Sequence, residues 1–183
     1  LGRGGSVCRA LMEMSGARLR VEDNKAIIRG SDHQRHLCSE AVRIMLQQRK
    51  SKDVRIDFSN LEKRKEVATL DVPIGALGYL MGARAQTLQK LGQSSAAFLF
   101  FDNFQREDRT KRLYIMGHYK NRRAAFYQAQ EIISEKITDK NWMTTKDQET
   151  LEDFRRDWDP KYDRIIGRRR RRYRDEDGGG DRR

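Results

Sequence analysis

The sequence feature that most constrains the fold of this chain is an incomplete internal repeat. Its second copy, residues 66–140, has the pattern strand, helix, loop, helix, strand, strand, helix. Its first copy, residues 1–49, has the same order without the opening strand and helix. Ten residues separate Gly5 from Ser15 in the first copy, and the matching loop and turn of the second copy have the same spacing. This repeat predicts two tandem copies of one small α+β unit.

Hydrophobic periodicity places the elements within each copy. In the first copy we expect these elements: helix 6–14, strand 17–21, strand 26–29 and helix 33–49. In the second copy we expect these: strand 67–72, helices 74–81 and 86–91, strands 96–101 and 112–116, and helix 121–136. The segment 50–65 between the copies is highly charged and is expected to be a linker. Within it Val54, Ile56 and Phe58 alternate, which predicts a short strand that would cover the open sheet edge of the first unit.

The two ends of the chain carry expectations of their own. The chain starts at Leu1 rather than Met, so we expect a fragment that begins inside a domain. Residues 141–183 have no sustained period, and we expect a polar, Arg-rich and mostly disordered tail. Its run Arg168–Arg172 would suit nonspecific RNA binding or a nuclear import signal.

The net charge of the chain indicates which class of partner it binds. Lys and Arg number 39 against 27 Asp and Glu, a net charge of +12. Such an excess points first to a polyanion, most often a nucleic acid. The absence of any apolar run of about 18 residues excludes a membrane-spanning helix. Cys8 and Cys38 cannot form a disulfide framework or a four-cysteine zinc site, so we expect a reducing setting in the nucleus or cytoplasm.

The first copy resembles a type I KH domain, with its cytosine-preferring members as the nearest type. The resemblance is carried by a G-x-x-G loop, an S-G-A turn and the glycine before the last helix: Gly2, Arg3, Gly4, Gly5, Ser15, Gly16, Ala17 and Gly30. The second copy is similar to the same family more loosely. The resemblance implies two tandem units, each with a three-stranded antiparallel sheet and three helices on one face. It also implies a groove for about four unpaired nucleotides.

The loop of the first copy has the chemistry of a phosphate clamp. Glycines lack a Cβ, so backbone N–H groups can approach a phosphate closely. The positive end of the dipole of the following helix lies at this loop and also favours a phosphate. The resemblance implies that Gly2, Arg3, Gly4 and Gly5 hold the RNA backbone, with Arg3 adding a charge at the tip.

Two arginines follow on the strand after the S-G-A turn. Arg18 and Arg20 alternate with Leu19 and Val21, which are expected to face the core. In cytosine-preferring KH domains an arginine at the place of Arg18 bonds the Watson–Crick edge of a base, and a guanidinium suits that edge. The alternative is a solvated strand face without a ligand.

The second copy departs from the family at its loop and at this strand. Ala85 stands where the family has glycine, and an alanine in a left-handed conformation costs about 1 kcal/mol or more. Phe98 and Phe100 replace the two arginines, either as stacking platforms for bases or as a packing surface against the other unit. The residues expected to form a lesser clamp are Gly82, Ala83, Arg84 and Ala85.

Two further groups of residues are interpreted as structural. His33, His36 and Cys38 lack a fourth ligand nearby, so we expect no metal and no other cofactor. The acidic cluster Asp147, Glu149, Glu152 and Asp153 has no base or nucleophile beside it and is expected to be a solvated face. We therefore predict a protein that is not an enzyme.

These observations together predict single-stranded RNA binding in post-transcriptional mRNA regulation or processing. The two alternatives are a protein-interaction scaffold with degenerate KH units and single-stranded DNA binding. Protein partners would use the second unit, and no membrane partner is expected.

Overall fold

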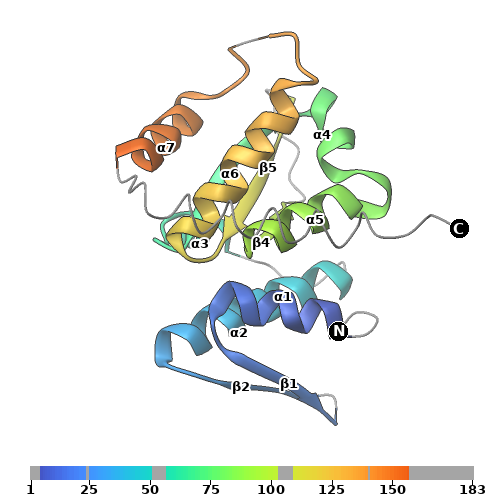
Figure 1. The fold of residues 1–183 in the computed structure, drawn as a ribbon, viewed down its shortest axis with the longest axis vertical. Helices are drawn as coiled ribbons and strands as arrows, with labels where there is room; N and C mark the ends of the chain where they lie inside the picture. Colours follow the sequence, from blue (N-terminus) through green and yellow to red (C-terminus); the bar gives the residue numbers. More distant parts are fainter. Residues whose placement is uncertain (1–4, 24, 51–56, 103–108, 140, 157–183) are drawn as a thin grey trace, which may run out of the picture.

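The computed structural model describes residues 5–23, 25–50, 57–102, 109–139 and 141–156. Their fold class is α+β, with two separate antiparallel sheets, which confirms the class predicted from the repeat (Figure 1). Several predictions concern residues outside these ranges and stay predictions: Gly2, Arg3, Gly4, Val54, Ile56 and the run Arg168–Arg172.

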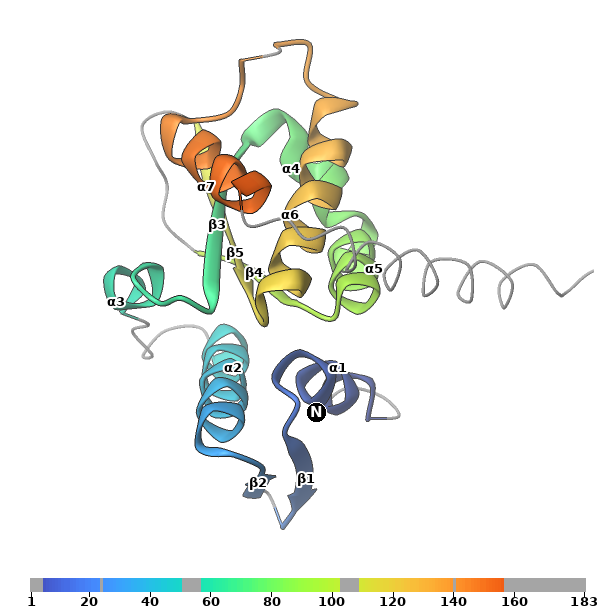
Figure 2. The same cartoon turned by 60° about the vertical axis from the view of Figure 1, so that its left-hand side comes forward.

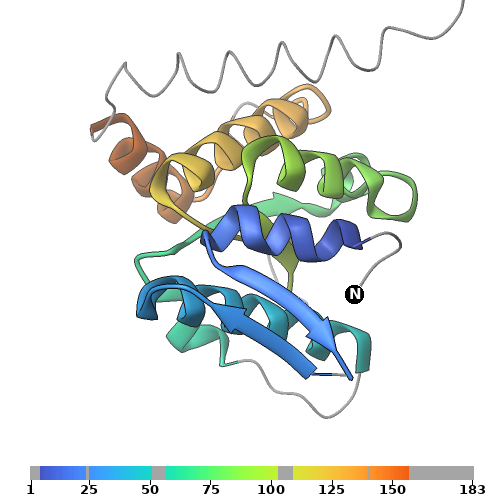
Figure 3. The same ribbon diagram turned by 60° about the horizontal axis from the view of Figure 1, so that its bottom comes forward.

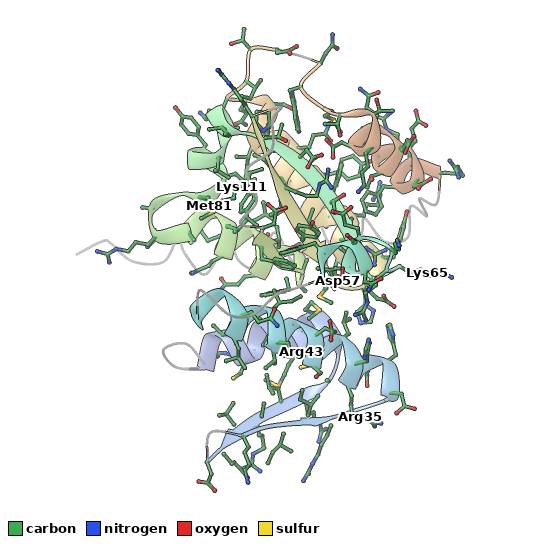
Figure 4. The ribbon with its side chains drawn as sticks, turned by 180° about the vertical axis from the view of Figure 1, so that it is seen from behind. Arg35, Arg43, Asp57, Lys65, Met81 and Lys111 are labelled. Carbon is green, nitrogen blue, oxygen red and sulfur yellow. The ribbon has the colours of Figure 1, made fainter. Side chains whose placement is uncertain are left out.

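The first unit consists of a helix, a hairpin and a long helix. Its elements are α1 (Ser6–Ser15), β1 (Arg18–Glu22), β2 (Lys25–Arg29) and α2 (Asp32–Lys50). The two strands are antiparallel, with Leu19 opposite Ile28. All four elements predicted for this unit are confirmed within two residues at each end. At the start of α2, Arg35 donates to the carbonyl oxygen of Gly30 at 2.6 Å and ties the helix to the end of the hairpin (Figure 4).

The second unit contains the complete repeat. Its elements are β3 (Val67–Pro73), α4 (Ile74–Met81), a short 3-10 turn (Ala83–Ala85), α5 (Gln86–Ser95), β4 (Phe98–Phe101), β5 (Thr110–Met116) and α6 (Tyr119–Ser134). The strand order is β3-β5-β4, so the last strand in the chain lies in the middle of the sheet. The seven-residue pairing of β3 with β5 sets Asp71 opposite Arg112.

One hydrophobic core lies between this sheet and the helices α4, α5 and α6. It contains the inward side chains of β3 and β5, such as Leu70 and Leu113, together with Phe126 and Ile133 of α6, all fully buried. These residues follow the spacing of a half-buried strand and of an amphipathic helix, which is why the sequence pattern located them.

A second core joins the two units. It contains Leu11 of α1, Leu37 of α2 and Leu19 of the hairpin, and it also contains Phe100 and Tyr114 from the opposite face of the second sheet. The helices α1 and α2 therefore lie between the hairpin and the second sheet (Figure 2). The result is a layered molecule in which each sheet has helices against it and α1 and α2 are shared.

A helix lies in the linker and begins at Phe58, the last of the three residues for which a short strand was predicted. Asp57 caps α3 (Phe58–Glu62) by accepting a hydrogen bond from the backbone N–H of Asn60 at 3.2 Å. Phe58 begins this helix, and its ring lies 5.1 Å from that of Tyr114. It therefore packs in the core between the units, away from the edge of the hairpin.

Another helix, α7 (Thr145–Arg156), lies in the tail, where the pattern indicated none. Its buried side chains include Leu151 and Phe154, which complete the core of the second unit. Asp147 is also buried, unlike the solvated residue expected, whereas Glu149 is exposed as predicted. The Asp147 carboxylate accepts hydrogen bonds from the backbone N–H of Thr144 at 3.0 Å and of Asp71 at 3.1 Å. It therefore completes a capping box with Thr144, whose hydroxyl accepts from the Asp147 N–H at the start of α7, and also satisfies an N–H of the edge strand β3.

Candidate nucleic-acid interface

The loop between α4 and α5 has an unusual backbone. Gly82 has φ 66° and ψ 177°, and an added Cβ would lie 2.2 Å from the hydroxyl of Thr87, so only glycine is accommodated. Arg84 and Ala85 follow with φ values of 51° and 61°. The side chain of Arg84 is exposed at the tip of the loop. The loop thus presents backbone and one cation at the start of α5.

Ala85 has a left-handed conformation, the case for which the sequence analysis gave the energetic cost of alanine. Its φ and ψ are 61° and 24°, and those of Gly5 are 72° and 13°. Each residue immediately precedes a helix of ten residues. The two loops therefore enter their helices in the same way, and the second does so with an alanine that raises the conformational energy by about 1 kcal/mol.

The far ends of α1 and α5 also match. Ser15 and Ser95 each bond back to the carbonyl oxygen four residues earlier, at 2.7 Å in both cases. The next residues, Gly16 and Ala96, are left-handed C-caps with φ 73° and 53°. Because both ends agree, Gly5 and Ala85 lie in the same relation to the strand that follows each helix.

The helices α1 and α5 start on one side of the molecule. Figures 1 and 3 show α1 and α5 running in the same direction, with their N-terminal ends toward the same side. Of the clamp predicted for the first loop, only Gly5 is among the described residues. A single extended ligand on that side would meet the positive ends of both helix dipoles.

The arginines predicted to read bases lie on an exposed, basic face of the hairpin. Arg18 and Arg20 point away from α1 and α2, and the strand register sets Arg18 opposite Arg29. Arg20 forms a salt bridge with Glu22 at 2.8 Å. Lys25 shares this face, so four cations face solvent around one carboxylate. Period-two alternation in the second strand could have identified Arg29 and Lys25, which sequence reasoning left out.

The phenylalanines that replace these arginines are packed against the first unit. Phe100 is 2% exposed, and its ring stacks on that of Tyr114 with 5.2 Å between centroids. Phe98 lies 5.3 Å from Phe100 and is partly buried against the same core. The faces of the Phe100 ring are thus occupied by protein, which is the packing arrangement weighed for these two residues in the sequence.

An exposed aromatic residue near the lesser clamp was missed from the sequence. Tyr79, one turn before Gly82, is 57% exposed, and the ammonium of Lys136 lies 5.3 Å from its ring. Ile74 on the same helix is 58% exposed. The sequence pattern predicted this helix without assigning its faces, and in the structure Ala76 and Leu80 are the residues that enter the core.

A partly buried group of charges near α3 forms its ion pairs and hydrogen bonds within the protein. The guanidinium of Arg112 bonds both carboxylate oxygens of Asp71 at 2.7 Å and one oxygen of Glu62 at 2.9 Å. Burial by itself raises the pKa of Glu62, but hydrogen bonds from Lys146, Arg112 and Tyr114 outweigh it and lower that pKa to about 2. These groups join α3, β3, β5 and α7 and offer no free acid or base.

The remaining candidates give no site in the described part of the chain. There, no three His, Cys, Asp or Glu side chains lie close enough together to hold a metal ion. Cys38 is fully buried, and His33 lies 3.8 Å from a carboxylate oxygen of Glu66. None of the described helices is both long and apolar enough to cross a membrane. No model of a known protein family matches the chain, and a search of curated proteins finds no match.

Proposed function

We propose that the chain binds single-stranded RNA through two tandem KH units, in post-transcriptional regulation or processing of mRNA. The observation that carries the proposal is the shared loop geometry. Gly5 and Ala85 have the same left-handed backbone, and each directs the start of a ten-residue helix to the same side. A loop of small residues at a helix N-terminus is suited to a phosphate.

The arrangement of the second unit supports the proposal. The resemblance implies a three-stranded antiparallel sheet with three helices on one face, and β3, β5 and β4 with α4, α5 and α6 have that arrangement. The first unit repeats its second half, with the same strand register at Leu19 and Leu99. Fold likeness alone does not establish activity, so the loops and their charges carry the functional argument.

The proposed mechanism has two kinds of contact, one to the phosphates of the RNA backbone and one to its bases. Backbone N–H groups of the loops, with Arg3 and Arg84, hold phosphates, so affinity falls as salt rises. Unpaired bases are then read beside the strand of the first unit, where Arg18 is exposed. The second unit binds more weakly, because its matching strand carries Phe98 and Phe100 and packs against the first unit. Linking the two contacts raises the effective concentration of the weaker one.

Charge reversal at the second loop tests the proposal. Arg84→Glu removes the exposed cation, and we expect about five- to tenfold weaker binding of a short pyrimidine-rich RNA by fluorescence anisotropy, as for the loss of one phosphate contact. Lys120→Glu makes the same charge change at an exposed position on α6 and should weaken binding about twofold or less. Equal losses from both variants would show that overall charge, not the loop, holds the RNA.

A companion experiment separates the first loop from the basic tail. Arg3→Asp with Gly4→Asp should abolish most binding, and removal of residues 161–183 should reduce it less. The deletion starts after α7 because that helix is part of the core. Circular dichroism checks that each variant is folded.

A protein-interaction scaffold is the second candidate, and one observation favours it. The first unit uses α1 and α2 to cover a sheet face, so its helices already serve as a packing surface. For a scaffold, the loop variants would leave RNA affinity unchanged while the tail deletion abolished it. Paired RNA and DNA oligonucleotides of one sequence test the single-stranded DNA alternative.

A further inference from the structure

A cleft of about 200 Å³ lies between α2 and α3. Side chains of residues 40–47 on α2 form one side of it, and side chains of residues 57–64 form the other. Figure 4 shows Arg43 on α2 close to Asp57, which precedes α3. Pockets for drug-sized ligands start at about 300 Å³, so this cleft has room for a single small ring system. It lies apart from the loops and strands of the proposed RNA contacts.

Apolar side chains and two guanidinium groups line the cleft. Ile44 is 2% exposed and Leu61 is 4% exposed, so these two form its bottom. Arg43 donates to one carboxylate oxygen of Glu40 at 3.0 Å, and Arg64 lies 3.3 Å from the other oxygen. One carboxylate therefore holds both guanidinium groups beside the cleft. Guanidinium planes and aliphatic side chains are surfaces on which a planar ring stacks.

Two side-chain amides also line the cleft. The Oε1 atom of Gln47 is buried and has no hydrogen-bond partner in the part of the chain that the structure describes. Asn60 donates through its amide nitrogen to the carboxylate of Asp57, which directs its amide oxygen away from that carboxylate. A buried acceptor without a donor is destabilising. The last torsion of a glutamine side chain is soft, so the Gln47 amide can turn toward the cleft and accept from a ligand N–H.

The charge of the cleft favours a neutral ligand. Glu40 and Asp57 balance Arg43 and Arg64, so the charges of the lining side chains sum to zero. The two carboxylates oppose a phosphate, and the described residues contain no group of three side chains that could hold a metal ion. A nucleobase is neutral and planar and carries N–H donors, so it fits the size, the lining and the charge of the cleft.

We propose that the cleft between α2 and α3 binds an adenine base, with Gln47 bonded to its amino edge and Arg43 stacked on its ring. A glutamine amide pairs with adenine through two hydrogen bonds, accepting from N6 and donating to N7. Uracil has an acceptor where adenine has its amino group, so it would leave the oxygen of Gln47 unpaired. The base belongs to a bound RNA or to a free adenine nucleotide. The RNA source rests on the proposed function, whereas the cleft itself does not.

Titration of the intact chain with adenosine monophosphate tests the cleft without RNA. Binding is followed through the backbone and side-chain amide signals in two-dimensional NMR spectra. We expect saturable shifts at Gln47, Asn60 and Leu61, and uridine monophosphate should need about tenfold higher concentrations for the same shifts. Equal responses to the two nucleotides would overturn the proposal, and so would shifts confined to the loop at residues 82–85.

Substitutions of the lining residues separate ligand recognition from a structural role. Gln47→Leu removes the unpaired acceptor, so it should raise the melting temperature by about 2 °C or more while weakening adenosine monophosphate binding about tenfold. Arg43→Lys keeps the charge but loses the planar group, and it should weaken binding about threefold. Gln93→Leu, at an exposed position of α5, is the matched control and should change neither property. A lower melting temperature for Gln47→Leu, or unchanged binding by either cleft variant, would overturn the proposal.

Two RNAs that differ at one position identify the source of the base. A uracil-rich RNA with one adenine is compared with the all-uracil RNA of the same length by fluorescence anisotropy. For a base supplied by RNA, the adenine should strengthen binding about tenfold, and Gln47→Leu should remove that gain while Arg84→Glu weakens both RNAs alike. Equal RNA affinities with the nucleotide shifts retained would assign the cleft to a free adenine nucleotide. If neither RNA binds, the proposed function fails, and the nucleotide titration still decides whether the cleft binds adenine.

Discussion

Single residues show how the two units adopt the same backbone conformation with different sequences. Gly5 and Ala85 occupy the same left-handed position, and Gly16 and Ala96 occupy another. Glycine adopts this conformation freely, whereas alanine brings its Cβ close to the following carbonyl oxygen. The second unit thus holds two strained alanines at the ends of α5. Its surroundings, including Asn121, which donates to the carbonyl oxygen of Ala96 at 3.0 Å, fix the conformation.

Glycine at the strained loop position should stabilise the protein. Ala85→Gly relieves the left-handed strain and should raise the free energy of unfolding by up to about 1 kcal/mol, after the entropy that glycine adds to the unfolded chain. Ala83→Gly is the control, because Ala83 does not have a positive φ and should lose about 0.5 to 1 kcal/mol. Urea unfolding followed by circular dichroism measures both. Equal effects of the same sign would contradict the left-handed conformation at Ala85.

At the scale of elements, alternation and helical spacing predicted the parts of the repeat. Strands β3 and β5 and helices α1, α2 and α6 have an apolar period, and their positions followed from it. The helix α7 could not be found in this way. Its twelve residues contain only Leu151 and Phe154 as large apolar side chains, so tertiary packing rather than local pattern determines it.

Loss of packing at α7 should therefore destabilise the second unit. Phe154→Ala removes a ring that lies 5.4 Å from Phe126 and 5.5 Å from Tyr119, and should cost about 3 kcal/mol. Glu152→Ala, at an exposed position of the same helix, should change stability by less than about 0.5 kcal/mol. Thermal unfolding gives both values, and faster hydrogen exchange at Asp71 would accompany the first variant. Similar melting temperatures for the two variants would mean that α7 is not docked on β3.

At the scale of the whole molecule, the two faces of the equivalent strands explain the packing of the units. Arg18 and Arg20 keep the hairpin face open to solvent, whereas Phe98 and Phe100 make the matching face of the second sheet apolar, and α1 and α2 cover it. The sequence left packing and base stacking as alternatives for the phenylalanines. Periodicity assigns a side chain to one face of a strand, but it does not identify what covers that face.

Only part of the candidate site could be predicted from the sequence, because periodicity does not identify what covers a face. The spacing of Gly82 to Ala85 located the second loop, whereas the positive φ values of Arg84 and Ala85 became known only from the structure. The exposed position of Tyr79 depends on how α4 is rotated against α6, which no local pattern determines.

The most direct test of the central claim compares single-stranded and duplex forms of one pyrimidine-containing RNA. A KH groove reads unpaired bases, so pairing them should hide the groove contacts and leave only contacts to phosphates. The unmodified chain should bind the single strand at least about tenfold more tightly than the duplex at 150 mM salt, by fluorescence anisotropy. Equal affinities, or tighter binding of the duplex with its denser charge, would show that the net charge of +12 alone accounts for binding and would contradict the groove.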